Sequence, residues 1–244
     1  MRSLPSLFLP LICAIGLVGC WAAPGKPLSG SEAKRPDQVL DFPTLYKENC
    51  SACHGDQGRI GAAISLANPA YLEFAGAANL ERITANGVPG TMMPPFSKNA
   101  GGALTHRQIE ILVQGMVSSW GRPSVPSGLN PLAYASNLHG DVTEGRKTFI
   151  AFCSRCHGED AQGTVAGRMR TGSLVEPAYL SLISDQGLRS LIVAGQPDQG
   201  MPGSTSDLSG DGARPMTDQE ITDVVAWLAS HRTPTPGQPY QPHR

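Results

Sequence analysis

The chain of 244 residues has 19 basic and 20 acidic side chains, a formal net charge of −1. This balance provides no excess of basic charge, so it indicates neither a nucleic-acid partner nor electrostatic binding to an anionic membrane. Twenty-eight glycines and twenty-one prolines are many for this length, and aromatic residues make up only 6%. Such a composition favours short helices joined by long loops.

Residues 1–19 have the features of a secretory signal peptide, with a basic residue near the start and an apolar run too short for a dependable membrane span. The run ends in a Leu-Val-Gly-Cys sequence at Cys20, which resembles the lipobox of bacterial lipoproteins. We therefore expect an exported protein with lipid on Cys20 and a flexible tether at residues 20–40. An ordinary signal peptide with an incidental cysteine is the alternative.

The next predicted element is a short helix that leads directly into the first of two C-x-x-C-H pentads. Asp41 is a candidate N-cap, and a proline follows in the first turn. The pentad is the signature of covalent c-type haem attachment, in which two thiols add to the haem vinyl groups and the histidine offers a neutral imidazole to the iron. The two pentads are Cys50-Ser-Ala-Cys53-His54 and Cys153-Ser-Arg-Cys156-His157.

Two other interpretations of the four cysteines are a zinc site and a pair of redox dithiols. A Cys₄ zinc site usually separates its two pairs by about 15–20 residues, whereas positions 54 to 152, which are 99 residues, separate Cys53 from Cys153. A dithiol motif needs no adjacent histidine, yet both copies have one. If Cys13 leaves with the signal and Cys20 carries lipid, no further cysteine remains for a disulfide or as an iron ligand.

The chain contains an internal repeat, which predicts two modules of one kind. The sequence Pro-Ala-Tyr-Leu follows both Asn68 and Glu176, at an offset of 108 positions. The offset is 103 upstream of this match and 112 downstream of it. The second copy is therefore expected to contain two short insertions, of five residues after His157 and of four residues after Met201.

We expect the first module at residues 41–120 and the second at 141–232, joined by a linker at 121–140 and followed by a disordered tail at 233–244. A module of about 80–90 residues buries little apolar surface by itself. A covalently held haem would supply the missing contact area.

The last helix of each module is predicted from a capping box followed by an apolar stripe at helical spacing. We interpret both stripes as core, and we expect Asp141 or Thr143 to begin the helix into Cys153. No segment alternates like a strand for long, so the fold class is mostly α. The boxes are Thr105-x-x-Gln108 and Thr217-x-x-Glu220; the stripes are Ile109, Leu112, Val113, Met116 and Ile221, Val224, Val225, Leu228.

With these features the chain resembles a tandem class I cytochrome c over residues 41–120 and 141–232. The resemblance implies two small helical bundles, each wrapped around a covalent haem c. It also implies a distal methionine some 40 residues after the histidine, on a loop before the last helix and followed by proline. Met93 comes 39 positions after His54, and Met201 comes 44 positions after His157. The resemblance thus implies His54 and Met93 as ligands of one iron, and His157 and Met201 as ligands of the other.

Other methionines and histidines compete for these roles. The repeat pairs Met201 with Met93 rather than with Met92, and it pairs Met216 with Leu104, so Met216 is interpreted as a packing residue. Met169 lies in the inserted loop and has no partner in the first copy. Four further histidines are interpreted as surface residues, since none pairs with another in the repeat: His106, His139, His231 and His243.

With both axial positions filled by protein, neither iron has an open site, and no catalytic residue is expected. We expect a di-haem carrier of single electrons in a respiratory or photosynthetic chain. Its lipid would hold it to the outer face of the cytoplasmic membrane or to the periplasmic side of the outer membrane. Its partners would be redox proteins: a quinol-oxidising complex, a terminal oxidase, a reaction centre or a dehydrogenase. The alternatives are a di-haem peroxidase or sulfur-compound oxidoreductase, an electron-accepting subunit of a periplasmic dehydrogenase, and an assembly subunit whose haems only fold it.

Overall fold

The computed structural model describes residues 34–122, 132–166, 169–204 and 214–233. The chain divides into Met1–Gln38, in which the short 3₁₀ helix η2 (Pro36–Gln38) is described, and a compact unit at Val39–Arg244. The predicted signal, Cys13, Cys20 and the predicted tail beyond residue 233 lie outside the described residues. In the part that is described, no helix is both long and apolar enough to cross a membrane.

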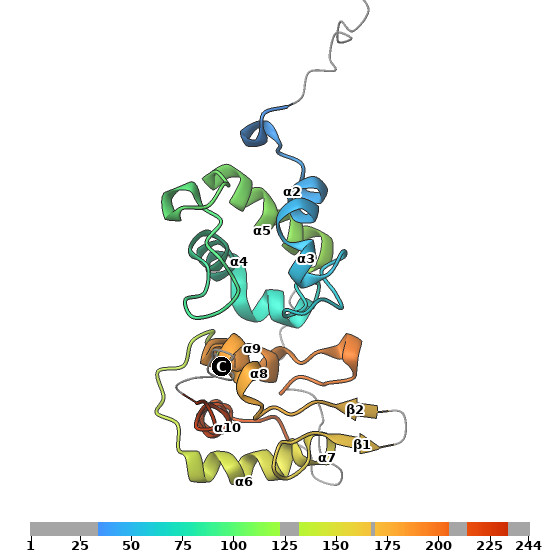
Figure 1. Cartoon of the computed structure of the whole chain (residues 1–244), viewed down its shortest axis with the longest axis vertical. Coiled ribbons are helices and arrows are strands. Elements are labelled where there is room, and N and C mark those ends of the chain that lie inside the picture. The colour runs from blue at the N-terminus through green and yellow to red at the C-terminus, as the bar shows by residue number, and fades with distance from the viewer. Residues whose placement is uncertain (1–33, 123–131, 167–168, 205–213, 234–244) are drawn as a thin grey trace, which may run out of the picture. The chain divides into compact units, whose positions relative to one another are not determined.

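The first module is helical, as predicted, and its elements surround one core (Figure 1). Asp41 is the N-cap of its first helix and accepts a hydrogen bond from the Thr44 amide at 3.0 Å. Gly76 has a φ of 69° and kinks the longest helix. The elements are α2 (Phe42–Asn49), α3 (Ser51–His54), α4 (Pro69–Asn86), η3 (Lys98–Ala100) and α5 (His106–Trp120).

The second module repeats this order with one addition. Its first helix begins after Asp141, the first of the two predicted caps. Where the first module has the kink at Gly76, the second begins a separate helix with Ser184 as N-cap. The elements are α6 (Val142–Phe152), α7 (Ser154–His157), β1 (Thr164–Ala166), β2 (Met169–Thr171), α8 (Pro177–Leu182), α9 (Asp185–Ala194), η4 (Pro197–Gln199) and α10 (Asp218–Ala229).

The addition is the antiparallel hairpin of β1 and β2, in which Thr164 pairs with Thr171. It lies in the first predicted insertion, after His157, and the sequence did not predict it. Equivalent backbone hydrogen bonds locate the second insertion. The amide of Leu104 donates to the carbonyl of Phe96 at 2.7 Å, and the amide of Met216 donates to the carbonyl of Ser204 at 3.1 Å. It therefore falls between Ser204 and Met216, and residues 205–213 there lie outside the described part.

Both predicted capping boxes are present at the starts of α5 and α10. Every residue of the two predicted stripes is buried, including Met116 at 3% exposure. The stripes pack into two clusters, one for each module. The prediction of a mostly helical fold with two tandem bundles is therefore confirmed.

In both modules the last helix packs against the first, and a glycine permits the close approach. This glycine is on the last helix in the first module and on the first helix in the second. In the first module, a Cβ on Gly115 of α5 would lie 2.2 Å from the ring of Phe42 on α2. In the second module the glycine is Gly145 on α6. A Cβ there would lie 2.0 Å from the carbonyl oxygen of Asp223 and 2.8 Å from the Cβ of Trp227, both on α10. The large and small residues have changed places across the same helix pair, so each core is filled.

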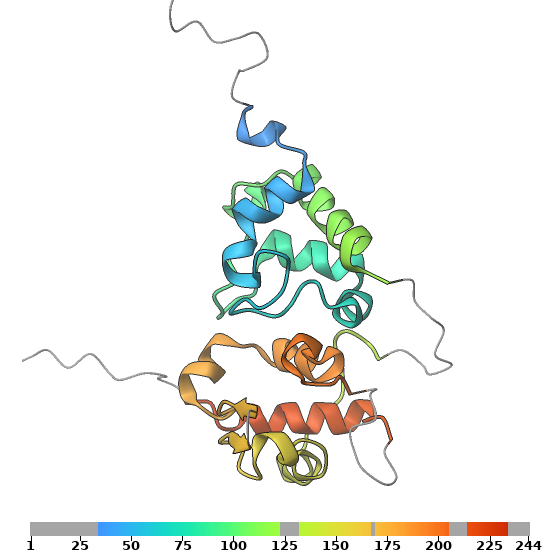
Figure 2. The same cartoon turned by 90° about the vertical axis from the view of Figure 1, so that its right-hand side faces the viewer.

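The two modules share an interface within the compact unit, at which α4 and α9 lie side by side (Figure 2). Phe74 of α4 contacts the ring of Tyr134, with centroids 5.4 Å apart, and the guanidinium of Arg189 lies 5.8 Å from the Phe74 ring. Ala194, the last residue of α9, belongs to the core of the first module. Apolar and cation–π contacts thus join the modules directly.

Candidate functional site

The two pentads are held in the same conformation by one turn of helix each, α3 and α7. The amide of His54 donates to the carbonyl of Cys50 at 3.0 Å, and that of His157 donates to the carbonyl of Cys153 at 3.0 Å. A glycine with positive φ then ends each turn. The two cysteines and the histidine of each pentad are therefore brought together on a rigid piece of backbone, as covalent haem attachment requires.

His54 has the burial and the hydrogen bond expected of a proximal ligand. It is 7% exposed, and its Nδ1 lies 2.8 Å from the carbonyl oxygen of Ile64. Burial lowers the pKa of His54, so the ring is neutral at physiological pH. If Nδ1 carries the proton and donates it to Ile64, the lone pair of Nε2 is free for a metal, the second-shell arrangement common to metal-binding histidines. The residues of the first site therefore fit a haem iron.

His157 differs from His54 in one respect. Burial also lowers its pKa, so it too offers a neutral imidazole. Its buried Nδ1, however, has no hydrogen-bond partner among the described residues. The donor set of the second site fits a haem iron equally well, but the orientation of its histidine is less constrained.

None of the four pentad cysteines forms a disulfide bond. Burial, followed by the neighbouring cysteine of each pair, raises the pKa of Cys50 and of Cys153 to about 12. Reactive redox dithiols have depressed pKa values, so the dithiol interpretation is disfavoured. Within the described residues, no three His, Cys, Asp or Glu side chains form a group that could hold a metal ion.

Met93 and Met201 occupy equivalent loops that fold back against the preceding helix. Gly87 and Gly195 end those helices, each with a φ of 67°. A Cβ on Gly87 would lie 2.6 Å from the carbonyl oxygen of Met93, and a Cβ on Gly195 would lie 2.6 Å from that of Met201. Only glycine permits both this backbone conformation and this close approach. The repeat register that paired the two methionines therefore has a structural counterpart.

Backbone bonds reinforce the equivalence. The amide of Val88 donates to the Met93 carbonyl at 3.0 Å, and the amide of Gln196 donates to the Met201 carbonyl at 2.7 Å. Met201 also returns a bond, from its own amide to the carbonyl of Gln196 at 3.1 Å. Backbone hydrogen bonds thus hold the loops of both methionines in place. Their roles as iron ligands stay predictions.

The competing methionines have different surroundings. Met92 is 75% exposed, and Met216 is 5% exposed within the core of the second module. The side chain of Met169 is outside the described part of the chain.

The competing histidines contact protein groups or solvent. His106 pairs with Glu110 at 3.2 Å, and the Nδ1 of His231 lies 2.9 Å from the carbonyl oxygen of Trp227. His139 is exposed, and His243 lies outside the described residues.

Sequence reasoning missed a contribution from Tyr46 to the first site. Its hydroxyl donates to the carbonyl of Gly55, directly after the pentad, at 2.9 Å. The equivalent residue Phe149 has no hydroxyl. Tyrosine four positions before the first pentad cysteine was the available signal.

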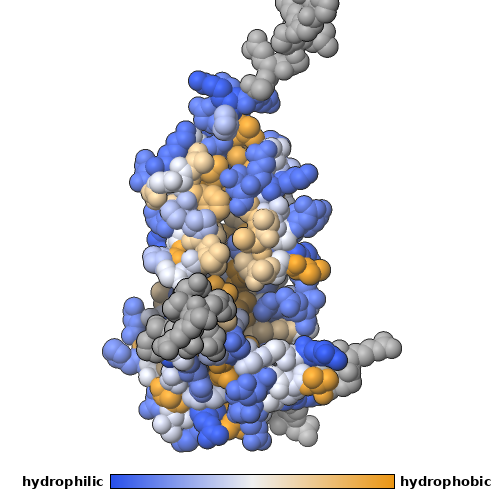
Figure 3. All heavy atoms as spheres, in the orientation of Figure 1, coloured by the Kyte–Doolittle hydropathy of each residue, from blue (hydrophilic) through white to orange (hydrophobic). Residues whose placement is uncertain are grey.

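Hydrophobic residues also gather around a hollow in the face of the first module that Figure 3 shows.

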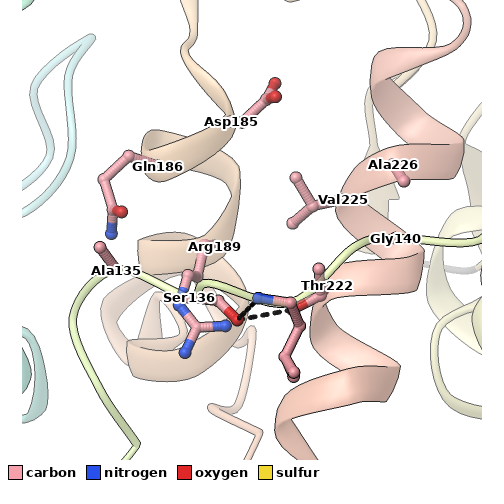
Figure 4. A pocket seen from close by; sticks show the side chains of 10 residues that line it. Ala135, Ser136, Gly140, Asp185, Gln186, Arg189, Thr222, Val225 and Ala226 are labelled. Atoms are coloured by element: carbon pink, nitrogen blue, oxygen red, sulfur yellow. Dashed lines mark hydrogen bonds between the residues drawn. The ribbon is translucent and has the colours of Figure 1, made fainter.

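A separate cavity of ≈ 250 Å³ lies in the second module between α9, α10 and residues 135–140 (Figure 4). Thr222 donates to Ser136 across it at 3.3 Å. Arg189 on its wall is only 4% exposed and pairs with Asp218 at 2.7 Å. No pentad residue and neither predicted methionine ligand lines this cavity, so we assign the haem sites elsewhere.

Comparison with known families agrees with this geometry in both modules. A family model described as "Cytochrome c" matches residues 142–232. A second, described as "Cytochrome C oxidase, cbb3-type, subunit III", matches residues 37–114. The two matched ranges contain the two pentads and both predicted methionine ligands.

One curated relative is the "Cbb3-type cytochrome c oxidase subunit CcoP" of Azospirillum sp. (strain B510). It is 28% identical to this chain over 154 residues, which cover 57% of this chain and 47% of the relative. The chain thus spans about half the length of that relative.

Two solved structures show weaker likeness. The Kuenenia stuttgartiensis reducing HAO-like protein complex has 17% identity and a TM-score of 0.44, covering 83% of this chain and 100% of that chain. The thiosulfate dehydrogenase from Marichromatium purpuratum has 18% identity and a TM-score of 0.28, covering 84% and 48%. At these scores neither likeness establishes a shared arrangement of the domains.

Proposed function

We propose that this protein, which is a c-type cytochrome with two class I domains in tandem, carries one haem in each domain and passes single electrons between redox proteins at a membrane. Its cytochrome c domains make it an electron-transfer protein. The count of two haems and the membrane location are parts of the proposal.

The observation that carries the proposal is that each module supplies its own complete set of groups. Each set has two cysteines and a histidine of lowered pKa at one turn of helix, with a methionine on a loop held against a glycine. The thiols would add across the vinyl groups as two thioether bonds. When bound, haem c supplies an iron that changes between the ferrous and ferric states. The sets are Cys50, Cys53, His54, Met93 and Cys153, Cys156, His157, Met201.

The protein groups would then determine which oxidation state is favoured. A neutral methionine thioether stabilises ferrous iron more than a second imidazole does, so the potential is raised. Of the two pentad histidines, His54 is the more buried, at 7% exposure, and a rigid fold would limit rearrangement when the charge changes. If a histidine and a methionine both bind each iron, the protein itself would fill the positions that a substrate would need. Electron transfer therefore suits these sites better than peroxidase chemistry, which needs a sixth position that opens.

The similarity to the Azospirillum oxidase subunit supports a place beside a membrane oxidase, as a donor or as a subunit. A quinol-oxidising complex, a reaction centre or a dehydrogenase would use the same sites, and an electron-accepting subunit of a periplasmic dehydrogenase is the second candidate. Purification from detergent-solubilised membranes, followed by identification of the proteins that accompany the chain, separates these partners.

We further propose that the chain is exported and held by lipid on Cys20, at the outer face of the cytoplasmic membrane or the periplasmic side of the outer membrane. The Leu-Val-Gly-Cys sequence supports this location, and two or more acyl chains suffice for stable anchoring.

Haem stoichiometry tests the central proposal. We expect two haems per chain that survive denaturing electrophoresis, because thioether bonds are covalent. Cys50→Ala with Cys53→Ala should reduce the count to one, and Cys153→Ala with Cys156→Ala should do the same. A wild-type count of one haem, or zinc in metal analysis, would contradict the proposal.

A further inference from the structure

The methionine loop of the second module is held by a side chain from the first module. The Nδ2 of Asn68 donates to the carbonyl oxygens of Ala194 at 3.1 Å and Gly195 at 3.0 Å. Asn68 is 3% exposed, and its Oδ1 accepts from the amide of Ala70 at 3.0 Å as the N-cap of α4. One buried amide therefore begins a helix in one module and binds the end of α9 in the other.

These two acceptors lie at the end of α9, directly before the residue whose backbone binds that of Met201. Carbonyls in the last turn of a helix have no partner within the helix and need one from elsewhere. Gly195, the C-cap of α9, directly precedes Gln196, which exchanges two backbone bonds with Met201 at 2.7 and 3.1 Å. The Asn68 amide is thus one peptide unit away from the residue that fixes the Met201 backbone.

A second contact joins the same segments. Nη1 of Arg59, which follows the first pentad, lies 3.1 Å from Oδ1 of Asp198 in η4. Both side chains are partly exposed, so the pair contributes little energy by itself, but it restrains the same loop in the same direction. Asn68 and Met201 also line a common cavity of ≈ 520 Å³.

Within the described part of the chain, no hydrogen bond from the second module holds the Met93 loop in the same way. The residue equivalent to Asn68 in the second module is Glu176, which is exposed and caps its own helix through the Tyr179 amide at 2.9 Å. No described contact joins Glu176 to the loop of Met93. The two haem sites are therefore not equivalent, although the repeat makes their ligands so.

We infer that Asn68 is a positioning residue for Met201, so that the first module holds the methionine ligand of the second haem in place. This rests on the proposed function, in which Met201 binds iron. The hydrogen bonds of Asn68 within the described residues go to Ala70, Ala194 and Gly195, so it acts on Met201 through Gly195 and Gln196.

Asn68→Asp is the discriminating variant, because its carboxylate still accepts from the Ala70 amide, as a good N-cap, but donates nothing to the two carbonyls. Hydrogen exchange in the holoprotein should show the amides of residues 195–204 exchanging about tenfold faster, since two buried hydrogen bonds are lost. Amides of residues 87–96, in the equivalent loop of the first module, should keep their wild-type rates. Glu176→Gln is the matched control and should change neither loop.

A spectroscopic measurement then separates positioning from simple destabilisation. In a Met93→His background, the ferric methionine–iron band reports Met201 alone, and adding Asn68→Asp should weaken it. Unchanged exchange in residues 195–204, or equal acceleration in both loops, would overturn the inference. So would faster exchange with an unaltered band. If Met201→His by itself leaves the spectrum unchanged, Met201 is not an iron ligand and the proposed function is contradicted. That outcome is distinct from a failure of Asn68 to position the loop, which the exchange rates of residues 195–204 measure.

Discussion

If Met93 and Met201 bind iron as proposed, each of them sets the redox potential of its own site. Replacing either with histidine removes a thioether that favours ferrous iron, so Met93→His and Met201→His should each lower one midpoint potential, by on the order of 0.1 V, and leave the other nearly unchanged. A spectroelectrochemical titration resolves the two steps.

Met92 provides the control for this measurement, because it adjoins Met93 but is 75% exposed. Met92→His should keep both wild-type potentials. If the Met93 and Met201 variants instead retain wild-type spectra while Met92→His does not, the ligand of the first site has been assigned wrongly.

The glycines that end α4 and α9 should be as sensitive as the methionines. Gly87→Ala and Gly195→Ala place a Cβ 2.6 Å from the carbonyl oxygen of Met93 or Met201, so each loop must move. We expect each variant to weaken the ferric methionine–iron band of its own site and to lower the free energy of unfolding by about 1–3 kcal/mol.

Matched controls for these variants exist in the same loops. Gly90 and Gly200 also have positive φ values, of 76° and 80°, but nothing lies within 4 Å of a Cβ at either position. Gly90→Ala and Gly200→Ala should cost a similar backbone strain and leave the band intact. Equal spectral loss in all four variants would show that backbone strain, and not displacement of the methionine, is responsible.

Residues with a fixed spacing were predictable, and residues that act across the fold were not. The pentads and the Met-Pro pairs could be read from the sequence because haem attachment constrains their order. The acceptor of His54 is a backbone carbonyl at Ile64, which no motif marks. The role of Asn68 had one signal: it is the position at which the otherwise identical Asn-Pro-Ala-Tyr-Leu and Glu-Pro-Ala-Tyr-Leu segments differ.

At the level of elements, the capping box of α10 makes stability depend on pH. Nη1 of Arg214 donates to Glu220 at 2.8 Å, and this bond, with those from Thr217, lowers the pKa of Glu220 to about 2 from 4.5. A lowered pKa stabilises the folded state above the unfolded value, and that stability is lost as the pH falls from about 4.5 to about 2. Glu220→Gln should therefore lower the free energy of unfolding by about 1 kcal/mol at pH 7, and the difference from wild type should vanish near pH 2.

Denaturant unfolding at a series of pH values measures this difference. Glu144→Gln is the control, because its pair with Lys147 has side chains 56% and 67% exposed and should contribute little. A deficit of Glu220→Gln that persists unchanged at pH 2 would mean that the charge of Glu220 is not what stabilises the helix start.

Helix starts were the elements best predicted from sequence, because a cap and its acceptor lie within three residues of each other. Asp41, Thr105 and Thr217 cap the helices that the sequence indicated. The hairpin of β1 and β2 was missed, since two strands of three residues are too short to show alternation. The exchange of glycine and aromatic residue between Gly115 and Gly145 also left no local pattern, because each partner lies on a distant helix.

At the scale of the whole molecule, the repeat predicted two modules but could not predict their interface. A repeat is recognised by residues that both copies share, whereas an interface between unlike faces uses residues that differ. Arg189 of α9 makes contacts of this kind, which the repeat did not indicate. It donates to the carbonyl of Ala133 at 2.8 Å and to that of Tyr134 at 3.1 Å, and both acceptors lie in the predicted linker. The second half of that linker is therefore bound to the second module.

Attachment to a membrane should depend on Cys20 and not on a helix. Cys20→Ala should release a red protein that still binds both haems, or leave it held by an uncleaved signal at residues 1–19. Cys13→Ala is the matched control, because Cys13 would leave with the signal, and it should stay in the membrane fraction. The predicted tether of residues 20–40 includes η2 at its end. Its first part, residues 20–35, would span about 22 Å as a flexible coil, enough to let the first module meet a partner at the surface. Mass spectrometry of the mature terminus decides the matter: acyl chains on Cys20 support the anchor, and an unmodified terminus at Trp21 or Ala23 excludes it.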